Sequence, residues 1–97
     1  MKILALEQEL PGSTLEGFHQ YAREEARKAW ELHQAGWIRE LYFRVDREEA
    51  VLVLECANVA EAQEILAELP LVREGLIRFE LIALKTYDGF ERLFANL

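Results

Sequence analysis

The order of apolar and polar residues along the chain predicts four strands and two main helices. Alternating apolar positions, which are typical of strands, occur at residues 2–8, 37–45, 50–56 and 75–84. Apolar positions three and four residues apart, which are typical of helices, occur at residues 14–35 and 58–68, with a shorter pattern at 88–94. The predicted order is therefore strand, helix, strand, strand, helix, strand, and then a short terminal helix.

Residues that cap or break helices mark the ends of the two main helices. Ser13 and Glu16 have the spacing of a capping box, in which each residue satisfies a free donor at a helix start. Asn58 and Glu61 repeat this spacing at the second helix. Pro70 ends that helix, because the residue before a proline avoids helical geometry.

The first predicted helix has an apolar stripe that is rich in alanine, so we expect it to lie close to a sheet. The stripe consists of Leu15, Phe18, Ala22, Ala26, Ala29 and His33. We interpret His33 as a buried histidine and also as a candidate catalytic group. His19 and His33 lie about 21 Å apart on one helix at 1.5 Å per residue, so they cannot share a metal ion.

This element order predicts an α+β fold of the ferredoxin-like type, βαββαβ, with a four-stranded antiparallel sheet and both helices on one face. The last strand carries two alternating rows of side chains, and one of these rows is continuously apolar. The two rows are Ile77, Phe79, Leu81 and Ala83, and Leu76, Arg78, Glu80, Ile82 and Leu84. We expect one row to belong to the core and the other, with the aromatic tail, to belong to an interface.

A second copy packed sheet to sheet would cover the open face, so we predict a homodimer or a higher homo-oligomer. The space between the sheets would form a cavity with a few polar groups. The candidates for this site are Glu40, Tyr42, Arg44, Glu55 and Glu80, together with His33. The register of residues 50–56 is ambiguous by one position, and we favour Glu55 on the side of Glu40 and Tyr42 because this groups the polar residues.

Length, charge and cysteine content narrow the possible functions. The 97 residues are enough for one domain, residues 1–97, and 52% of them are hydrophobic, which favours an apolar interface. The formal net charge of −7 argues against partners such as nucleic acid or an anionic membrane. Cys56 is the only cysteine, and we interpret it as a buried apolar residue in a cytoplasmic protein. No apolar run is long enough to span a membrane.

Four segments together resemble the muconolactone isomerase-like family of the dimeric α/β-barrel superfamily. They are residues 29–32, 36–44 and 66–72, which includes Leu69, Pro70 and Leu71, and the aromatic tail 87–94. The resemblance implies a ferredoxin-like fold and a dimer. It also implies a cofactor-free isomerase, or a binder of a small carbonyl-bearing metabolite. No motif assigns a catalytic residue by position.

Candidate chemistry follows from the polar row that contains Glu40, Tyr42 and Arg44. A carboxylate that loses water in the cavity would have a raised pKa and would move a proton beside a carbonyl group. Tyrosine or arginine would stabilise the enolate, without a cofactor or a metal ion. The alternative is a non-catalytic ligand-binding or assembly module. A haem-handling monooxygenase relative is a third hypothesis, which requires His19 or His33 to face the cavity.

Overall fold

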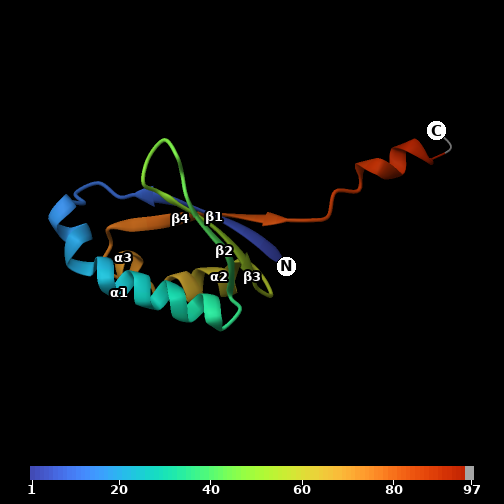
Figure 1. The fold of residues 1–97 in the computed structure, drawn as a ribbon. Helices are drawn as coiled ribbons and strands as arrows, with labels where there is room; N and C mark the ends of the chain where they lie inside the picture. The colour runs from blue at the N-terminus through green and yellow to red at the C-terminus, as the bar shows by residue number, and fades with distance from the viewer. Residues whose placement is uncertain (96–97) are drawn as a thin grey trace.

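The structure of the chain is a computed structural model that describes residues 1–95. The elements are β1 (Lys2–Glu9), α1 (Leu15–Gln34), β2 (Ile38–Phe43), β3 (Ala50–Glu55), α2 (Val59–Leu66), α3 (Pro70–Arg73), β4 (Ile77–Leu84) and the 3₁₀ helix η1 (Gly89–Leu93) (Figure 1). The ends of the predicted elements differ from the observed ends by at most two residues, whereas α3 was not predicted.

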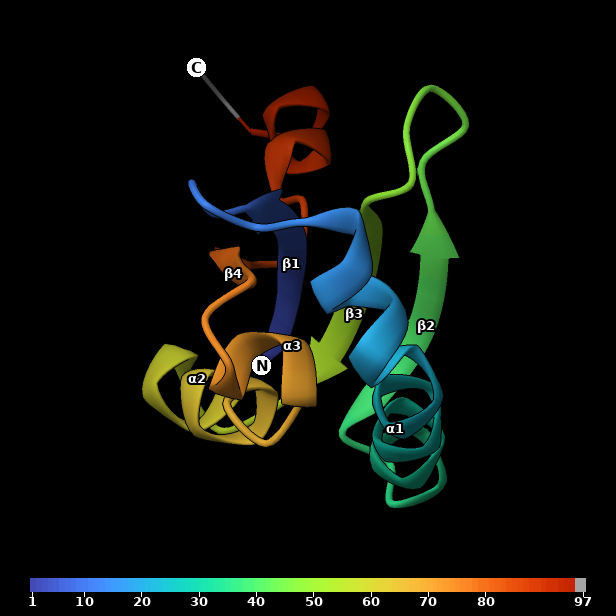
Figure 2. The ribbon, with the colours of Figure 1, turned by 90° about the vertical axis from the view of Figure 1, so that its left-hand side faces the viewer.

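The four strands form one antiparallel sheet in the order β2-β3-β1-β4, and the helices lie on one face of it. Seen end-on, α1 lies under β2, whereas α2 and α3 lie nearer β1 and β4 (Figure 2). This arrangement confirms the predicted ferredoxin-like α+β fold.

The core lies between the sheet and the helices, because alternate residues of each strand point toward the helix layer. Ile3, Ile38 and Leu54 are fully buried there, and Cys56 is 4% exposed, as expected for a small apolar residue. The apolar row of β4 also faces the helices, since Leu81 pairs with Ala5 on the same side. The sequence predicted that one of the two β4 rows belongs to the core, and the structure shows that it is the row of Leu81.

The cap of α1 differs from the prediction by one residue. Thr14 is the N-cap, and its hydroxyl accepts a hydrogen bond from the Gly17 N–H at 3.0 Å. Ser13 instead donates to the carbonyls of Leu10 and Leu76, which ties the start of α1 to the β4 end of the sheet. The Asn58 cap is as predicted: its side chain accepts from the Glu61 N–H, at 2.8 Å.

The buried side of α1 is rotated from the predicted apolar stripe. Of that stripe only Phe18 and Ala29 are partly buried, whereas Leu15, Ala22, Ala26 and His33 are exposed. The side facing the core instead consists of Phe18, Tyr21, Glu25, Ala29 and Leu32. The prediction of the buried stripe was wrong because Glu24, Glu25 and Lys28 face the other helices. They contact Arg73, the Leu71 N–H and Glu68, respectively. This orientation turns part of the apolar stripe outward.

Pro70 begins a short helix as well as ending the previous one. It occupies the first turn of α3, where its missing N–H is not needed, and Leu69 before it is extended. Leu69 and Leu71 are buried. The Leu-Pro-Leu segment therefore changes the chain direction and inserts two leucines under the sheet.

The second face of the sheet is open within residues 1–95. Tyr42 pairs with Val51 and Glu40 with Val53, after an irregularity near Arg39 that adjusts the β2 register. Glu55 therefore lies on the same face as Glu40 and Tyr42, as we favoured. The apolar members of this open face are Leu4, Leu6, Val51, Val53, Ile82 and Leu84.

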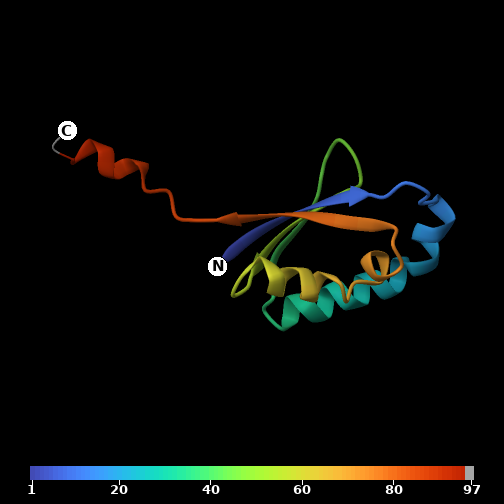
Figure 3. The ribbon, with the colours of Figure 1, turned by 180° about the vertical axis from the view of Figure 1, so that it is seen from behind.

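The aromatic tail extends away from the rest of the chain. Residues 85–94 leave the end of β4 and project beyond the sheet (Figure 3). The radius of gyration of 16.1 Å exceeds the value of about 13 Å expected for a compact chain of this length. Tyr87, Phe90, Leu93 and Phe94 are between 68% and 85% exposed. No part of the described chain covers this segment.

Candidate functional site

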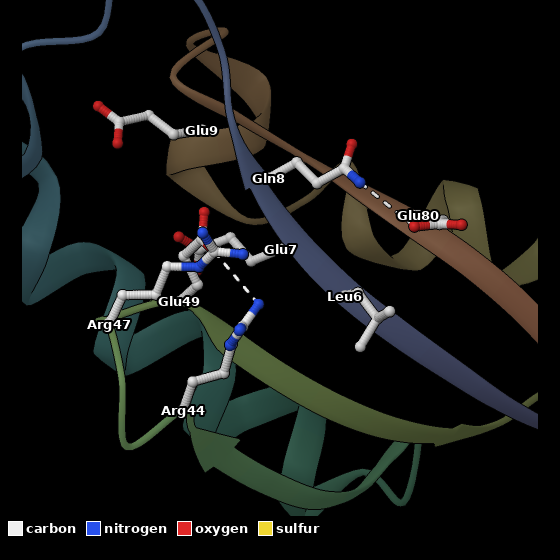
Figure 4. Close-up of a pocket in the computed structure, with 8 residues that line it drawn as sticks. All are labelled: Leu6, Glu7, Gln8, Glu9, Arg44, Arg47, Glu49 and Glu80. Carbon is white, nitrogen blue, oxygen red and sulfur yellow. Dashed lines mark hydrogen bonds and ion pairs between the residues drawn. The ribbon is translucent and has the colours of Figure 1, made fainter.

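A pocket of about 520 Å³ lies at the end of β1, beside the loop that joins β2 to β3. Figure 4 shows its lining side chains. They are Leu6, Glu7, Gln8, Glu9, Arg44, Arg47, Glu49 and Glu80. Seven of these eight residues are polar or charged, so the pocket is suited to a polar ligand more than to an apolar one.

The pocket exists because β3 diverges from β1. Pairing between these strands ends at Leu6 and Val51, whereas β1 continues beside β4 as far as Glu9. At the divergence, the Glu7 carboxylate accepts a hydrogen bond from the Ala50 N–H at 3.1 Å. The Glu7 carboxylate thus accepts the hydrogen bond that a backbone carbonyl of β1 would accept if the pairing continued. This bond to the Ala50 N–H holds the Glu7 side chain in place.

Glu7 contributes to the pocket a carboxyl group whose pKa departs clearly from the ordinary value for glutamate. Loss of hydration on burial raises the pKa of the Glu7 carboxyl, and the Ala50 N–H lowers it in part. The negative charges of Glu49, Glu25 and Glu9 raise it further. A carboxyl with a raised pKa, held at the wall of a pocket, is suited to accept and return a proton.

Two arginines from the segment that joins β2 to β3 provide positive charge in the pocket lining. Arg47 Nε lies 2.6 Å from Glu49 Oε1, and Arg44 Nη1 lies 3.9 Å from the same oxygen. Arg44 also donates two hydrogen bonds to Asp46, which raises the pKa of Arg44 and lowers that of Asp46. Both guanidinium groups are close to Glu49, and they are available to a ligand oxygen that competes with this carboxylate.

The structure brings only two of the predicted site residues into this pocket. Arg44 and Glu80 line it, and Glu80 accepts a hydrogen bond from the Gln8 amide at 3.2 Å. Glu40 and Tyr42 lie outside it and form their own hydrogen bond, at 2.6 Å, which raises the pKa of the Tyr42 phenol. We therefore give this pair no role in the pocket.

The other two candidates lie at the opposite end of the sheet or on α1. Glu55 is 3.3 Å from the N-terminal amino group of Met1. His33 is exposed, and its Nδ1 lies 2.8 Å from the Ile38 carbonyl, so the proton is on Nδ1. The expectation that His33 is buried was wrong, because it lies on the outward flank of α1.

Sequence reasoning missed Glu7 as a site residue. A signal was present, since Glu7 continues the buried row of Ile3 and Ala5 on a strand whose first half is apolar. A carboxylate on a core-facing row needs a specific partner. The partner, the Ala50 N–H, is 43 residues away and is supplied only by the fold.

Glu25 was also missed, and it lies on the core-facing side of α1. Its carboxylate accepts a hydrogen bond from the Leu71 N–H at 2.9 Å, at the start of α3. Loss of hydration raises the pKa of Glu25, while the Leu71 N–H and the Arg73 charge lower it in part. Glu25 therefore joins α1 to α3, and its ionised form is disfavoured by partial burial.

Two substitutions of Glu25 should separate the effect of its hydrogen bond to Leu71 from the effect of its raised pKa. In the folded chain the Glu25 pKa lies above 4.5, because the fold favours the protonated carboxyl. The protonated carboxyl therefore stabilises the fold fully below pH 4.5, and this stabilisation is lost as the pH rises through the folded pKa. We expect Glu25→Gln to keep the bond to Leu71 and to remove this loss. Glu25→Ala should cost about 1–3 kcal/mol at every pH, because the Leu71 N–H loses its acceptor.

Urea unfolding at several pH values between about 4.5 and 8 would measure both effects. The expected result is a smaller decline of unfolding free energy with rising pH in Glu25→Gln than in the unchanged chain. Parallel curves for the two proteins would contradict the assigned pKa shift.

No family model matches the chain, and no curated protein matches its sequence. Solved structures do match. Muconolactone isomerase has a TM-score of 0.74 at 20% identity, over 92% of this chain and 93% of that one. The 5-chloro-2-hydroxyhydroquinone dehydrochlorinase TftG from Burkholderia phenoliruptrix AC1100, bound to 2,5-dihydroxybenzoquinone, has a TM-score of 0.71 at 15% identity, over 92% and 98%. The resemblance seen in the sequence is thus confirmed as a shared fold.

No helix within residues 1–95 is long and apolar enough to cross a membrane. No group of three or more His, Cys, Asp or Glu side chains in the same part of the chain is arranged to hold a metal ion.

Proposed function

We propose that this chain, which has the fold of muconolactone isomerase, binds a small carbonyl-bearing metabolite and isomerises it by proton transfer without a cofactor. The observation that carries the proposal is Glu7. It is a half-buried carboxyl with a raised pKa, it lines the pocket of about 520 Å³, and a backbone N–H holds it in place. This volume is suited to a small molecule.

In the proposed reaction, the Glu7 carboxylate removes a proton from the carbon next to the ligand carbonyl. The bonding electrons move into the carbonyl, which becomes an enolate oxygen, and Arg44 or Arg47 stabilises its negative charge. Glu7 then returns the proton to a different carbon of the conjugated system. The double bond moves, no electrons are gained or lost, and the carboxylate is regenerated.

The similar structures support this class of ligand. One is named for the isomerisation of muconolactone, and the other was determined with 2,5-dihydroxybenzoquinone bound. Both names describe small molecules that bear carbonyl groups. We extend that ligand class to this chain because the two structures share its fold.

Glu7→Gln tests the proposed chemistry. The glutamine keeps an acceptor for the Ala50 N–H, so we expect the fold to be unchanged by circular dichroism. Turnover of muconolactone should fall about 100-fold or more, which is the usual contribution of a general acid–base group. Glu64→Gln, at an exposed position of α2, should leave turnover unchanged. Equal turnover in Glu7→Gln and the unchanged chain would rule out Glu7 as the proton carrier.

The proposal includes a homodimer that covers the open face of each sheet. Leu4 is its centre, since it pairs with Val53 on one side and Ile82 on the other. This arrangement is a row of apolar side chains across three strands, which water does not favour.

We also propose that residues 1–97 form one domain, because β1 and β4 pair from opposite ends of the chain. We propose a cytoplasmic location, which the single free cysteine, Cys56, supports.

A non-catalytic binding or assembly module is the second candidate function. The exposed aromatic tail favours it, because these side chains have no role in the pocket. Calorimetry would test this candidate. Binding of 2,5-dihydroxybenzoquinone, without turnover of this quinone or of muconolactone, would support a binding module over the isomerase.

A further inference from the structure

The carboxyl groups of Glu7 and Glu25 are both half-buried on the helix side of the sheet. Glu7 lies on the core-facing row of β1, and Glu25 lies on the core-facing side of α1. Each accepts a hydrogen bond from a backbone N–H of another element. The donor to Glu7 is Ala50 of β3, at 3.1 Å, and the donor to Glu25 is Leu71 of α3, at 2.9 Å. Both carboxyl groups are therefore held in place by the fold.

The two carboxyl groups are close enough for their charges to interact. Burial contributes most to the raised pKa of Glu7, and the negative charges of Glu49, Glu25 and Glu9 add to it. Glu9 and Glu49 belong to the sheet and to the segment before β3, whereas Glu25 belongs to the helix layer beneath the sheet (Figure 2). Helix α3, which holds Glu25, packs against both α1 and β4. The helix layer thus places one negative charge near Glu7.

The surroundings of the two carboxyl groups differ in their charge. Burial raises the pKa of Glu25, but the Leu71 N–H and the positive charge of Arg73 lower it in part. The charges that act on Glu7 are negative, and the Ala50 N–H is the group that opposes them. Glu25 is therefore the easier of the two to ionise, and Glu7 has to ionise against its charge.

We propose that Glu25 is a positioning residue for the proposed reaction: its negative charge, held beneath the sheet by α3, makes Glu7 the stronger proton acceptor. Glu25 is not among the residues that line the pocket, so it acts on the ligand through Glu7. A base that binds its proton more tightly removes a proton from carbon more readily. This inference rests on the proposed reaction of Glu7 and adds the helix layer to the parts of the chain that set its rate.

Other charged groups surround the pair and act on any titration of it. Those around Glu7 come from β1, β4 and the segment between β2 and β3, and those around Glu25 come from α1, α3 and the end of α2. They are Glu9, Glu80, Arg44, Arg47 and Glu49 for Glu7, and Glu24, Lys28, Arg73 and Glu68 for Glu25. A test must therefore change the charge of Glu25 and leave these groups in place.

NMR titration of the carboxyl carbons in the full chain measures the coupling directly. The Glu7 signal is identified by its loss in Glu7→Gln. Glu25→Gln removes the charge and keeps an acceptor for the Leu71 N–H, so we expect a folded chain in which the titration midpoint of Glu7 moves to lower pH. Glu25→Asp, which keeps the charge, should have a midpoint closer to that of the unchanged chain.

Glu24→Gln is the matched control for this titration. It removes the same charge from the neighbouring position of α1, which is exposed. The charge of Glu24 is not among those that raise the pKa of Glu7, so the Glu7 midpoint should be unchanged in this variant.

The pH dependence of muconolactone turnover gives the second readout. With Glu7 as the base, kcat/KM rises as the pH rises through the Glu7 pKa of the free protein. In Glu25→Gln this rise should move to lower pH together with the NMR midpoint. The value of kcat/KM above the rise should fall, because Glu7 is then a weaker base. A purely structural role of Glu25 would change kcat/KM by the same factor at every pH.

The two readouts separate the role of Glu25 from the proposed reaction. A Glu7 midpoint that is the same in Glu25→Gln and the unchanged chain, or that moves equally in Glu24→Gln, would overturn the role of Glu25 and leave the reaction standing. A lower midpoint in Glu25→Gln with an unmoved kcat/KM profile would confirm the coupling and exclude Glu7 as the base.

Discussion

Leu54→Ala is expected to lower the free energy of unfolding by about 2–5 kcal/mol, the usual cost of a leucine removed from a packed core. Leu54 is fully buried on the central part of the sheet and is paired with Ile3 and Ile38, which are also fully buried. The lost methyl groups leave a cavity that these neighbours cannot fill. Since small domains are stable by only about 5–15 kcal/mol, this variant should be partly unfolded near its working temperature. Urea unfolding would measure the lost free energy of unfolding.

Val53→Ala is the matched control for that result. Val53 is the preceding residue of β3 and points to the open face, where it is only partly buried. Its truncation removes fewer atoms from a less crowded place, so a dilute monomer should lose less than about 1.5 kcal/mol. Equal losses in the two variants would mean that the two faces of β3 have been exchanged.

Leu4→Asp is expected to convert the proposed homodimer into a monomer. In the separate chain Leu4 is partly exposed on the open face, so an aspartate there keeps contact with water. In a dimer that pairs the open faces, the same carboxylates would be buried without a partner near the two-fold axis. That arrangement costs several kcal/mol, so the dissociation constant should rise about 100-fold or more.

Sedimentation of Leu4→Asp at micromolar concentration would measure that change, with circular dichroism to show that the monomer is folded. Ala60→Glu, at an exposed position of α2, serves as the control, because α2 lies on the opposite side of the sheet from the open face. An unchanged dimer in Leu4→Asp would exclude the open face as the interface. Unfolding of the variant, with no folded monomer, would show that Leu4 belongs to the core instead.

Local patterns were sufficient for the elements of this fold. Alternation in the strands, helical spacing and the Asn58 cap gave every element except the short helix α3 to within two residues of its ends. They also favoured the observed face for Glu55, but they left open which row of β4 belongs to the core. The reason is that strand periodicity and capping depend on neighbours in sequence, which are visible without the fold.

The site was less predictable. Arg44 and Glu80 line the pocket, but Glu7 was missed because its effect depends on the distant Ala50 and on the charges of Glu49 and Glu25, which are also far away in the sequence. The stripe of α1 was misjudged for a related reason. A helix pattern shows that one side is apolar, yet which part of that side is covered depends on where α2 and α3 lie.

The sequence by itself determined the element order, the ferredoxin-like sheet and the presence of more apolar surface than one small chain can bury. These follow from periodicity and composition. Only the tertiary structure decided where that surplus lies: on the open face around Leu4, on the exposed side of α1 around Ala26, and in the tail around Phe90. It also decided that β3 leaves β1 at Glu7 and opens the pocket. These features depend on the relative positions of residues far apart in the chain, and burial and pKa are set by those positions.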